Sequence, residues 1–167
     1  TPGINFSYNK NEIKELCPGL EEYNLAEASA FIMKLKKGGS YGDIYTYDFQ
    51  YDDNGNIKLD NTGAPLLTSD ADTYAGNFNS KFHLGWSNTI NWKNLNIYAL
   101  VDGKIGGKVL SMTEAIMDGY GVSKATGDAR LNGGVPNKDG SMIDAEKYYS
   151  RVGGRAQNDG FDAMAYM

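Results

Sequence analysis

The stretch that decides the fold is KFHLGWSNTINWKNLNIYALVDGKI, residues 81–105. Apolar side chains take every second position over much of both halves. In the first half these positions are Phe82, Leu84, Trp86, Ile90 and Trp92. In the second half they are Leu95, Ile97, Ala99, Val101 and Ile105, with Tyr98 and Leu100 falling on the otherwise polar parity. A period of two residues is typical of a β-strand, so the stretch predicts a hairpin with a short turn at Lys93-Asn94.

The length of these two predicted strands is unusual. They contain about 12 and 11 residues, whereas strands of soluble proteins average about 5 or 6. A tilted strand that crosses a membrane in a β-barrel needs about 9–11 residues. The alternation and the placement of Trp86 and Trp92 match a barrel wall with interfacial aromatic residues. A long amphipathic hairpin in a soluble sandwich would show the same pattern, and the residues of the hairpin leave both alternatives open.

Composition narrows the function classes. The chain has 167 residues and a net charge of −5, with 16 basic and 21 acidic side chains. That length suits one domain, and the acidic balance gives no electrostatic footprint for nucleic acid. No apolar run is long enough for a transmembrane helix. The mean hydropathy of −0.49 is typical of a soluble domain, but a barrel wall with a polar face and long polar loops would share it.

The small number of cysteine and histidine residues excludes several kinds of site. With one cysteine and one histidine, the chain cannot form an internal disulfide or a structural zinc site. Cys17 lies in a Cys17-Pro18-Gly19 turn, where we expect a buried or half-buried apolar side chain. His83 falls on the polar parity of the hairpin. No nucleophile elbow and no phosphate-binding glycine loop is present, so we expect no enzyme activity and no cofactor.

Other segments predict further strands, turns and helices. Residues 4–13 predict the end of a strand, residues 30–36 a second strand, and residues 41–51 a third with a line of aromatic side chains. Turns are expected at Asp52–Gly55 and Asp60–Gly63. The first of these resembles a calcium loop only loosely, because the EF-hand register is absent.

The end of the chain is expected to be mostly loop from residue 108 to 167. Short helices are predicted over residues 109–120 and 144–151, separated by an irregular Gly- and Asn-rich stretch at 125–139. Long loops on one side of a sheet and two-residue turns on the other are the asymmetry of outer-membrane barrels.

Several motifs occur in an order that resembles one family. They are Gly76-Asn77 with Lys81-Phe82, the hairpin Asn88–Asn94, Gly106–Ser111, Tyr120–Ser123, and Arg130 with Gly133–Val135. Together with residues 5–13 they are similar to the C-terminal barrel part of SusC/RagA-type TonB-dependent outer-membrane transporters. The resemblance covers most of the chain, and it rests on the order and spacing of the pieces.

The resemblance implies an all-β fold, a segment of a large antiparallel transmembrane β-barrel whose long extracellular loops carry short helices. Residues 1–167 would then be a partial barrel, without the plug, the TonB box and the final strands. The implied location is the outer membrane, in contact with its lipid. The implied partners are a SusD-like lipoprotein, TonB for the full-length protein, and a glycan or peptide substrate, with an oligosaccharide expected.

Five loop residues are the candidate substrate-binding positions under this resemblance. They are Asp118, Tyr120, Arg130, Tyr148 and Tyr149. Aromatic rings can stack on sugar faces, while carboxylates and amides bind hydroxyls. For each residue, loop packing or contact with the lipoprotein is the plainer interpretation.

Two other functions remain open from the residues. One is a soluble, secreted β-rich carbohydrate-binding module whose Tyr41–Tyr51 stripe docks a polysaccharide. The other is a secreted hydrolase that uses paired carboxylates among Asp43, Asp48, Asp52 and Asp53.

Overall fold

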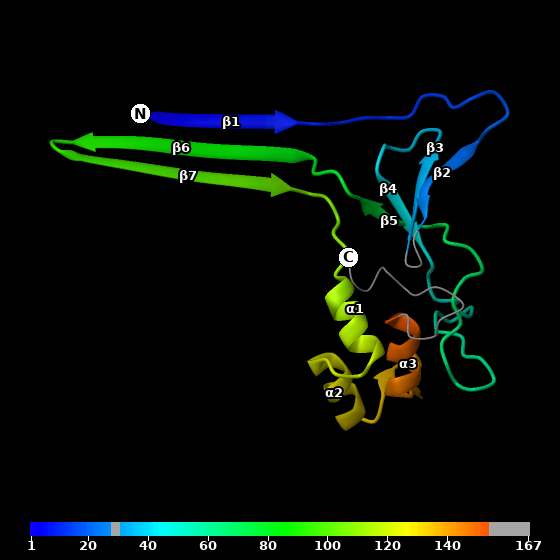
Figure 1. Ribbon diagram of the computed structural model, residues 1–167. Helices are drawn as coiled ribbons and strands as arrows, with labels where there is room; N and C mark the ends of the chain where they lie inside the picture. The colour runs from blue at the N-terminus through cyan, green and yellow to red at the C-terminus, as the bar shows by residue number, and fades with distance from the viewer. Residues whose placement is uncertain (28–30, 154–167) are drawn as a thin grey trace. The chain divides into compact units, whose positions relative to one another are not determined.

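A computed structural model describes residues 1–27 and 31–153 (Figure 1). Antiparallel sheets account for most of its regular structure. Contacts divide the chain into two compact units. The first, here the sheet unit, contains residues 1–23, 35–43 and 76–108. The second, here the helical unit, contains the remaining described residues. No helix among the described residues is long and apolar enough to cross a membrane.

The sheet unit is built on three long antiparallel strands, which lie side by side in Figure 1. They are β1 (Pro2–Tyr8), β6 (Phe82–Trp92) and β7 (Leu95–Ile105), in the order β1-β6-β7. Strands β6 and β7 have 11 residues each and are joined by Lys93-Asn94, where Lys93 has a positive φ of 52°. The predicted hairpin is therefore confirmed. The predicted strand near the start of the chain is also present, but it ends at Tyr8.

The register of this sheet places most apolar side chains of the three strands on one face. Cross-strand rows on this face are Ile4–Trp86–Val101, Phe6–Leu84–Gly103 and Tyr8–Phe82–Ile105. Rows on the opposite face are Gly3–Ser87–Leu100, Asn5–Gly85–Asp102 and Ser7–His83–Lys104. His83 therefore lies on the polar face as predicted, with Nε2 2.6 Å from Ser80 Oγ. We call the two sides the apolar face and the polar face.

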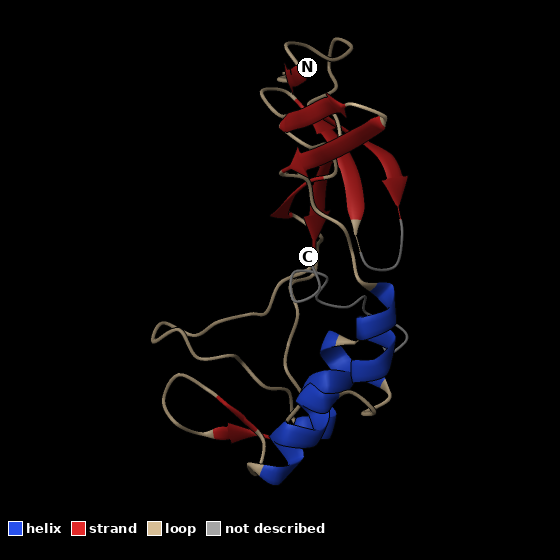
Figure 2. Ribbon diagram, turned by 90° about the vertical axis from the view of Figure 1, so that its left-hand side faces the viewer, coloured by secondary structure: helices blue, strands red, loops and turns tan. Residues whose placement is uncertain are grey.

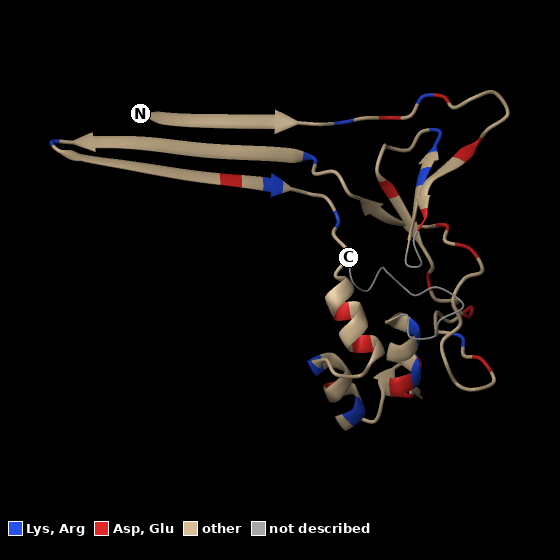
Figure 3. Cartoon of the chain, viewed as in Figure 1, with Lys and Arg blue, Asp and Glu red and all other residues tan. Residues whose placement is uncertain are grey.

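The apolar face is exposed and carries no charge. Ile4 is 78% exposed, Trp92 67% and Val101 60%. Strands β1 and β6 contain no Asp, Glu, Lys or Arg (Figure 3). The two charged residues of β7, Asp102 and Lys104, both belong to the polar face. A contiguous apolar surface of this kind on a protein marks a contact with another protein or with a membrane.

A second sheet has the strand order β2-β3-β4-β5. Its members are β2 (Glu22–Glu27), β3 (Ile32–Lys36), β4 (Asp43–Thr46) and β5 (Thr73–Asn77), and the division between the two units passes through these strands. The strand predicted over residues 30–36 corresponds to β3, and residue 30 lies outside the described residues. The sequence did not predict β2 or β5.

The long aromatic strand predicted over residues 41–51 is wrong. Only β4 is a strand there, and Phe49 and Tyr51 form isolated bridges with Leu67 and Ile57. The cause is Asp48, whose carboxylate accepts a hydrogen bond from the Phe49 N–H at 2.7 Å. A side chain that binds the backbone in this way competes with a continuous strand ladder. The fully buried side chains of β4, Ile44 and Thr46, are on the parity opposite to the aromatic residues.

Three helices dominate the later part of the helical unit (Figure 2). They are α1 (Met112–Gly119), α2 (Lys124–Leu131) and α3 (Ala145–Val152). The two predicted helices are confirmed as α1 and α3. Helix α2 corrects the expectation of an irregular stretch at 125–139, because Ser123 caps it by accepting a hydrogen bond from the Thr126 N–H. The strands between α2 and α3 are only β8 (Val135–Pro136) and β9 (Met142–Ile143), so this part holds little strand, as expected.

A small apolar core holds the helical unit together. Its buried members are Phe49, Ala115 and Val152, exposed by only 6%, 1% and 2%. Gly153 allows a close approach of α3 to α1, since a Cβ at this position would lie 2.3 Å from the Gly119 nitrogen. The unit therefore has its own packed interior.

The predicted tight turns are present. The Asp52–Gly55 turn is closed by the Asp52 N–H, which donates to the Asn56 carbonyl at 2.9 Å. The Asp60–Gly63 turn is closed in the same way by Asp60 and Ala64, at 2.8 Å.

Cys17 corrects one expectation in the sheet unit. Its turn forms as predicted, with the Leu20 N–H donating to the Cys17 carbonyl at 3.0 Å. The Cys17 side chain, however, is exposed. The reason is that the turn lies in a segment of mostly exposed residues, so no apolar interior is available to it.

Candidate functional site

The helices of the helical unit enclose a pocket of about 250 Å³. Four of the five predicted loop residues line it: Asp118 and Tyr120 at the end of α1, Arg130 on α2 and Tyr149 on α3. They meet because α3 packs against both α1 and α2. Residues that are up to 31 positions apart in the sequence (118 to 149) therefore share one cavity.

The fifth predicted residue, Tyr148, does not line this pocket. Its ring lies 5.6 Å from the ring of Phe49 and packs against the core of the helical unit. Adjacent residues of a helix point in directions about 100° apart, so Tyr148 and Tyr149 face different surroundings. Their rings still contact edge to face, at 5.1 Å. Tyr148 thus acts as a packing residue that supports Tyr149.

The pocket combines a buried acid with more exposed polar groups. Asp118 is only 6% exposed, whereas Tyr120 is 66% exposed. Burial, together with the carboxylates of Asp118 and Asp128, raises the pKa of the Tyr149 phenol above its usual range. The phenol therefore stays protonated at neutral pH and can donate a hydrogen bond.

The Arg130 guanidinium lies beside a glycine turn. A Cβ at Gly121, which has a φ of +71°, would be 3.0 Å from Arg130 Nη1. The absence of a side chain at Gly121 therefore leaves room for the guanidinium. Arg130 adds a fixed positive charge to a pocket whose other charged groups are the carboxylates of Asp118 and Glu146.

Two lining residues with polar side chains were missed from the sequence, Thr126 and Glu146. Each follows a helix cap: Ser123 caps α2, and Asp144 caps α3 by accepting from the Lys147 N–H. A cap followed by a polar residue at the third or second position was a usable signal. Glu146 is also three residues before Tyr149, a spacing that places both on one side of a helix.

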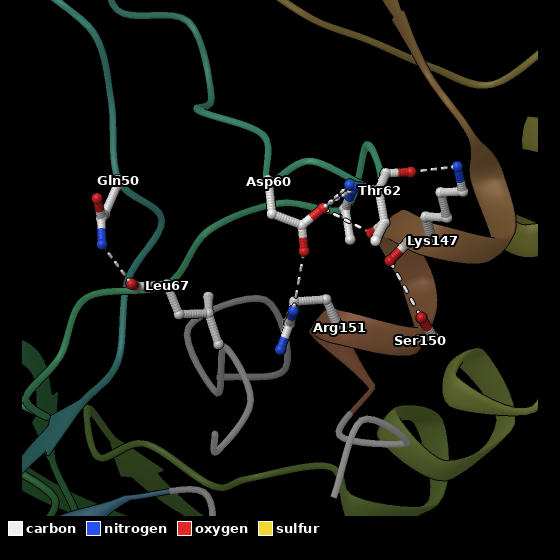
Figure 4. Close-up of polar contacts among 8 residues, drawn as sticks. Gln50, Asp60, Thr62, Leu67, Lys147, Ser150 and Arg151 are labelled. Atoms are coloured by element: carbon white, nitrogen blue, oxygen red, sulfur yellow. Dashed lines mark hydrogen bonds and ion pairs between the residues drawn. The ribbon is translucent and has the colours of Figure 1, made fainter. Parts of the chain in front are cut away.

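Polar turns hold α3 in place (Figure 4). Asp60 forms an ion pair with Arg151 at 3.6 Å, and Lys147 donates to the Thr62 carbonyl. The hydroxyl and N–H of Thr62 and the N–H of Ala64 all bind the Asp60 carboxylate, which lowers its pKa to about 2. Because Glu146 and Tyr149 lie on the same helix as Lys147 and Arg151, these contacts position part of the pocket wall.

Hydrogen bonds also join residues 56–57 to residues 137–139. Asn137 accepts from the Ile57 N–H at 2.9 Å, and Asn56 accepts from the Asp139 N–H at 2.9 Å. Asp52 uses its carboxylate for the N–H groups of Asn54 and Asn56 and for the Asn56 amide. The acidic turn is thus a hydrogen-bonded hairpin turn. Among residues 1–27 and 31–153, no group of three or more His, Cys, Asp or Glu side chains could hold a metal ion.

The pocket can therefore hold a small polar ligand through hydrogen bonds and charge. Two carboxylates, one guanidinium and two phenols converge on it. Searches against protein-family models and against curated proteins found no match to this chain.

Proposed function

We propose that this chain is part of a SusC/RagA-type TonB-dependent transporter in the outer membrane, which imports an oligosaccharide with a SusD-like lipoprotein. The apolar face of the sheet β1-β6-β7 is the observation that carries the proposal. Three strands present most of their apolar side chains in register on one side, without a charge and largely exposed. A lipid bilayer is the surrounding that such a face fits.

The dimensions of the hairpin support this assignment. A strand of 11 residues is about 36 Å long at about 3.3 Å per residue, and a tilt of about 45° reduces its height to about 25 Å. The apolar band of an outer-membrane barrel is about 25 Å tall and is flanked by aromatic residues. Here Trp92 lies beside the turn, and Tyr8 stacks on Phe82 at the other end of the strands, with ring centroids 5.2 Å apart.

The chain connections support it as well. Two residues, Lys93 and Asn94, join β6 to β7 at one end. At the other end, residues 9–81 connect β1 to β6, and the chain continues from β7 into the segment with the three helices. Outer-membrane barrels have short periplasmic turns and long extracellular loops. The pocket of Asp118, Arg130 and Tyr149 would then belong to an extracellular loop, where substrate and lipoprotein can reach it.

The soluble carbohydrate-binding module loses its main support. That alternative needed one continuous aromatic stripe over residues 41–51. Instead the ring of Tyr45 contacts Tyr74, with centroids 5.7 Å apart, and Phe49 packs into the core beside Tyr148. These rings therefore do not form one binding platform.

Labelling of intact cells tests the proposal. Cys17 is exposed and lies in the long connection between β1 and β6, so a membrane-impermeant maleimide added to cells should label it. An Asn94→Cys variant in a Cys17→Ser background puts the thiol at the short turn, and it should react only after the outer membrane is permeabilised. The Cys17→Ser chain alone is the blank.

Two results would contradict the transporter. One is equal labelling of both positions on intact cells. The other is recovery of the protein from the medium or the periplasm instead of the outer membrane, which the soluble alternative predicts.

A further inference from the structure

The polar face of the sheet β1-β6-β7 contains a groove of about 400 Å³ that is separate from the pocket of the helical unit. Gly3 on β1 and Gly85 on β6 contribute to its lining. Residues Asn5, Gly85 and Asp102 form one cross-strand row of this face. A Cβ at Gly85 would lie 3.3 Å from Asp102 Oδ1 and 3.6 Å from Asn5 Cβ. The missing side chain thus opens a floor between a carboxylate and an amide.

The next rows add a hydroxyl and an apolar wall. Ser87 follows Gly85 on the same face of β6, and its Oγ would lie 2.8 Å from a Cβ at Gly3. Tyr98 and Leu100, the two apolar exceptions on the polar face of β7, are 62% and 59% exposed and also line the groove. An apolar wall beside three hydrogen-bonding side chains therefore surrounds an open floor.

These groups select a class of ligand. The amide of Asn5 and the hydroxyl of Ser87 can each donate and accept, and Asp102 accepts. No lysine, arginine or histidine lines the groove, so the carboxylate of Asp102 is the charged group among its lining residues and would repel an anionic ligand. A wholly apolar ligand would leave the polar groups without partners. The combination suits a neutral, polyhydroxylated ring with one apolar side.

The backbone gives little to a peptide ligand at this place. Strand β6 is the central strand and pairs with β1 on one side and β7 on the other. Peptides that add to a sheet bind the free backbone groups of an edge strand, whereas the polar groups around this floor are the side chains of Asn5, Ser87 and Asp102. This difference favours a sugar over an extended peptide.

We infer that this groove is a subsite for one ring of a neutral oligosaccharide, with Tyr98 against the apolar side of the ring and Asn5, Ser87 and Asp102 at its hydroxyls. In naming the ligand class the inference rests on the proposed function, because an oligosaccharide is the cargo of the proposed transporter. In a barrel wall the polar face is turned towards the interior, so the subsite would lie on the path of the substrate.

Titration of the full chain in detergent micelles tests the subsite, because detergent covers the apolar face and leaves the polar face open. The probes are maltotetraose, xylotetraose and mannotetraose, with tetragalacturonate as an anionic sugar and tetraalanine as a peptide. Saturation-transfer NMR and calorimetry measure binding. We expect at least one neutral sugar to bind, and tetragalacturonate and tetraalanine not to bind.

Two matched glycine variants separate the groove from the fold. Gly85→Val fills the floor and should weaken sugar binding at least about tenfold. Valine favours a strand more than glycine does, but its Cβ would lie 3.3 Å from Asp102 Oδ1, so that carboxylate must shift slightly. Thermal unfolding is therefore measured beside binding, and we expect one cooperative transition to be retained. Gly103→Val makes the same change on the apolar face, where a Cβ meets only the Leu84 carbonyl at 3.8 Å, and should leave binding unchanged.

The aromatic wall gives a second pair of variants. Tyr98→Phe keeps the ring and should retain most of the affinity, whereas Tyr98→Ala should lose about tenfold. The subsite is overturned if no neutral sugar binds, if Gly85→Val binds like the unchanged chain, or if tetraalanine binding is the one that Gly85→Val removes.

The sugar-binding test of the subsite and the cell-labelling test of the transporter can fail independently. Correct labelling without sugar binding overturns the subsite alone. Sugar binding that Gly85→Val removes, in a chain that fails the labelling test, overturns the transporter alone.

Discussion

The sheet unit and the helical unit differ in how their apolar side chains are packed. On the sheet β1-β6-β7 the large apolar side chains of the apolar face are mostly exposed, and Trp92 remains 67% exposed. In the helical unit Ala115 and Val152 are almost fully buried, at 1% and 2%. Helix caps, close glycine contacts and ion pairs add to that interior.

The contrast shows where each unit obtains its stabilising free energy. The helical unit buries apolar side chains within itself, around Phe49, Ala115 and Val152, so this burial stabilises it in water. The apolar face of the sheet unit gains free energy only when something apolar covers it. Variants on the two units should therefore respond differently to lipid, and this difference can be measured.

A pair of lysine substitutions on β7 should give the largest effect. Val101 and Leu100 are adjacent and about equally exposed, at 60% and 59%, but lie on opposite faces. In lipid bilayers we expect Val101→Lys to lower the free energy of unfolding by about 2–4 kcal/mol, because its charge enters the apolar band. Leu100→Lys should have little effect. Urea titration in vesicles measures both, and equal losses would remove the distinction between the faces.

Packing variants should act on the helical unit whether lipid is present or not. A Cβ at Gly153 would lie 2.5 Å from the Ala115 carbonyl oxygen. We expect Gly153→Ala to cost about 1–3 kcal/mol by forcing α3 away from α1. Gly127→Ala on α2, where a Cβ meets nothing within 4 Å, should stabilise by about 0.5–1 kcal/mol. Helical circular dichroism during chemical unfolding reads both, and a neutral Gly153→Ala would contradict the close contact.

The cap of α2 should give a smaller loss. Ser123 Oγ accepts from the Thr126 N–H at 3.2 Å, so Ser123→Ala should cost about 1 kcal/mol. The matched control is Ser150→Ala inside α3, where alanine is the better helix former and no loss is expected. Amide exchange at Thr126 should accelerate in the first variant only. Unchanged exchange there would show that the cap does not limit the opening of α2.

The smallest effect should be a dependence on acid. The folded pKa of Asp60 is lowered to about 2 by its bonds with Thr62 and Ala64, below the usual value of about 3.9. Its stabilising contribution is therefore fully present above about pH 4 and is lost as the pH falls from about 4 to 2. Asp60→Asn should reduce the pH dependence of the thermal midpoint in that window. Asp53→Asn, at an exposed residue of the preceding turn, should leave that pH dependence unchanged. A profile unchanged by Asp60→Asn would contradict this role.

The sequence predicted local features well where one periodicity acts alone. Alternation over much of residues 81–105 was sufficient for β6, β7 and their turn, and the glycine turns at 55 and 63 followed from local chemistry. Local signals failed where side chains bind the backbone. Asp48 ends the aromatic strand, and Ser123 begins a helix in a stretch rich in glycine and asparagine.

Part of the candidate pocket was also within reach of the sequence. Asp118, Tyr120, Arg130 and Tyr149 were predicted as separate loop residues, and the structure places them around one cavity. The sequence had no means to exclude Tyr148, because the neighbour that draws it into the core, Phe49, lies 99 positions earlier (148 − 49). Long-range packing of this kind leaves no local pattern.

What the sequence alone determined is the alternation of apolar and polar side chains along each long strand, because a strand turns successive side chains to opposite sides. Only the tertiary structure decided that the apolar sides of β1, β6 and β7 coincide, because a shift of one residue in the register would have mixed the two faces. It also decided that Gly3 and Gly85 open one groove between Asn5 and Asp102. Cross-strand pairing joins residues that are about 80 positions apart (5 to 85), and that pairing is not contained in any local pattern.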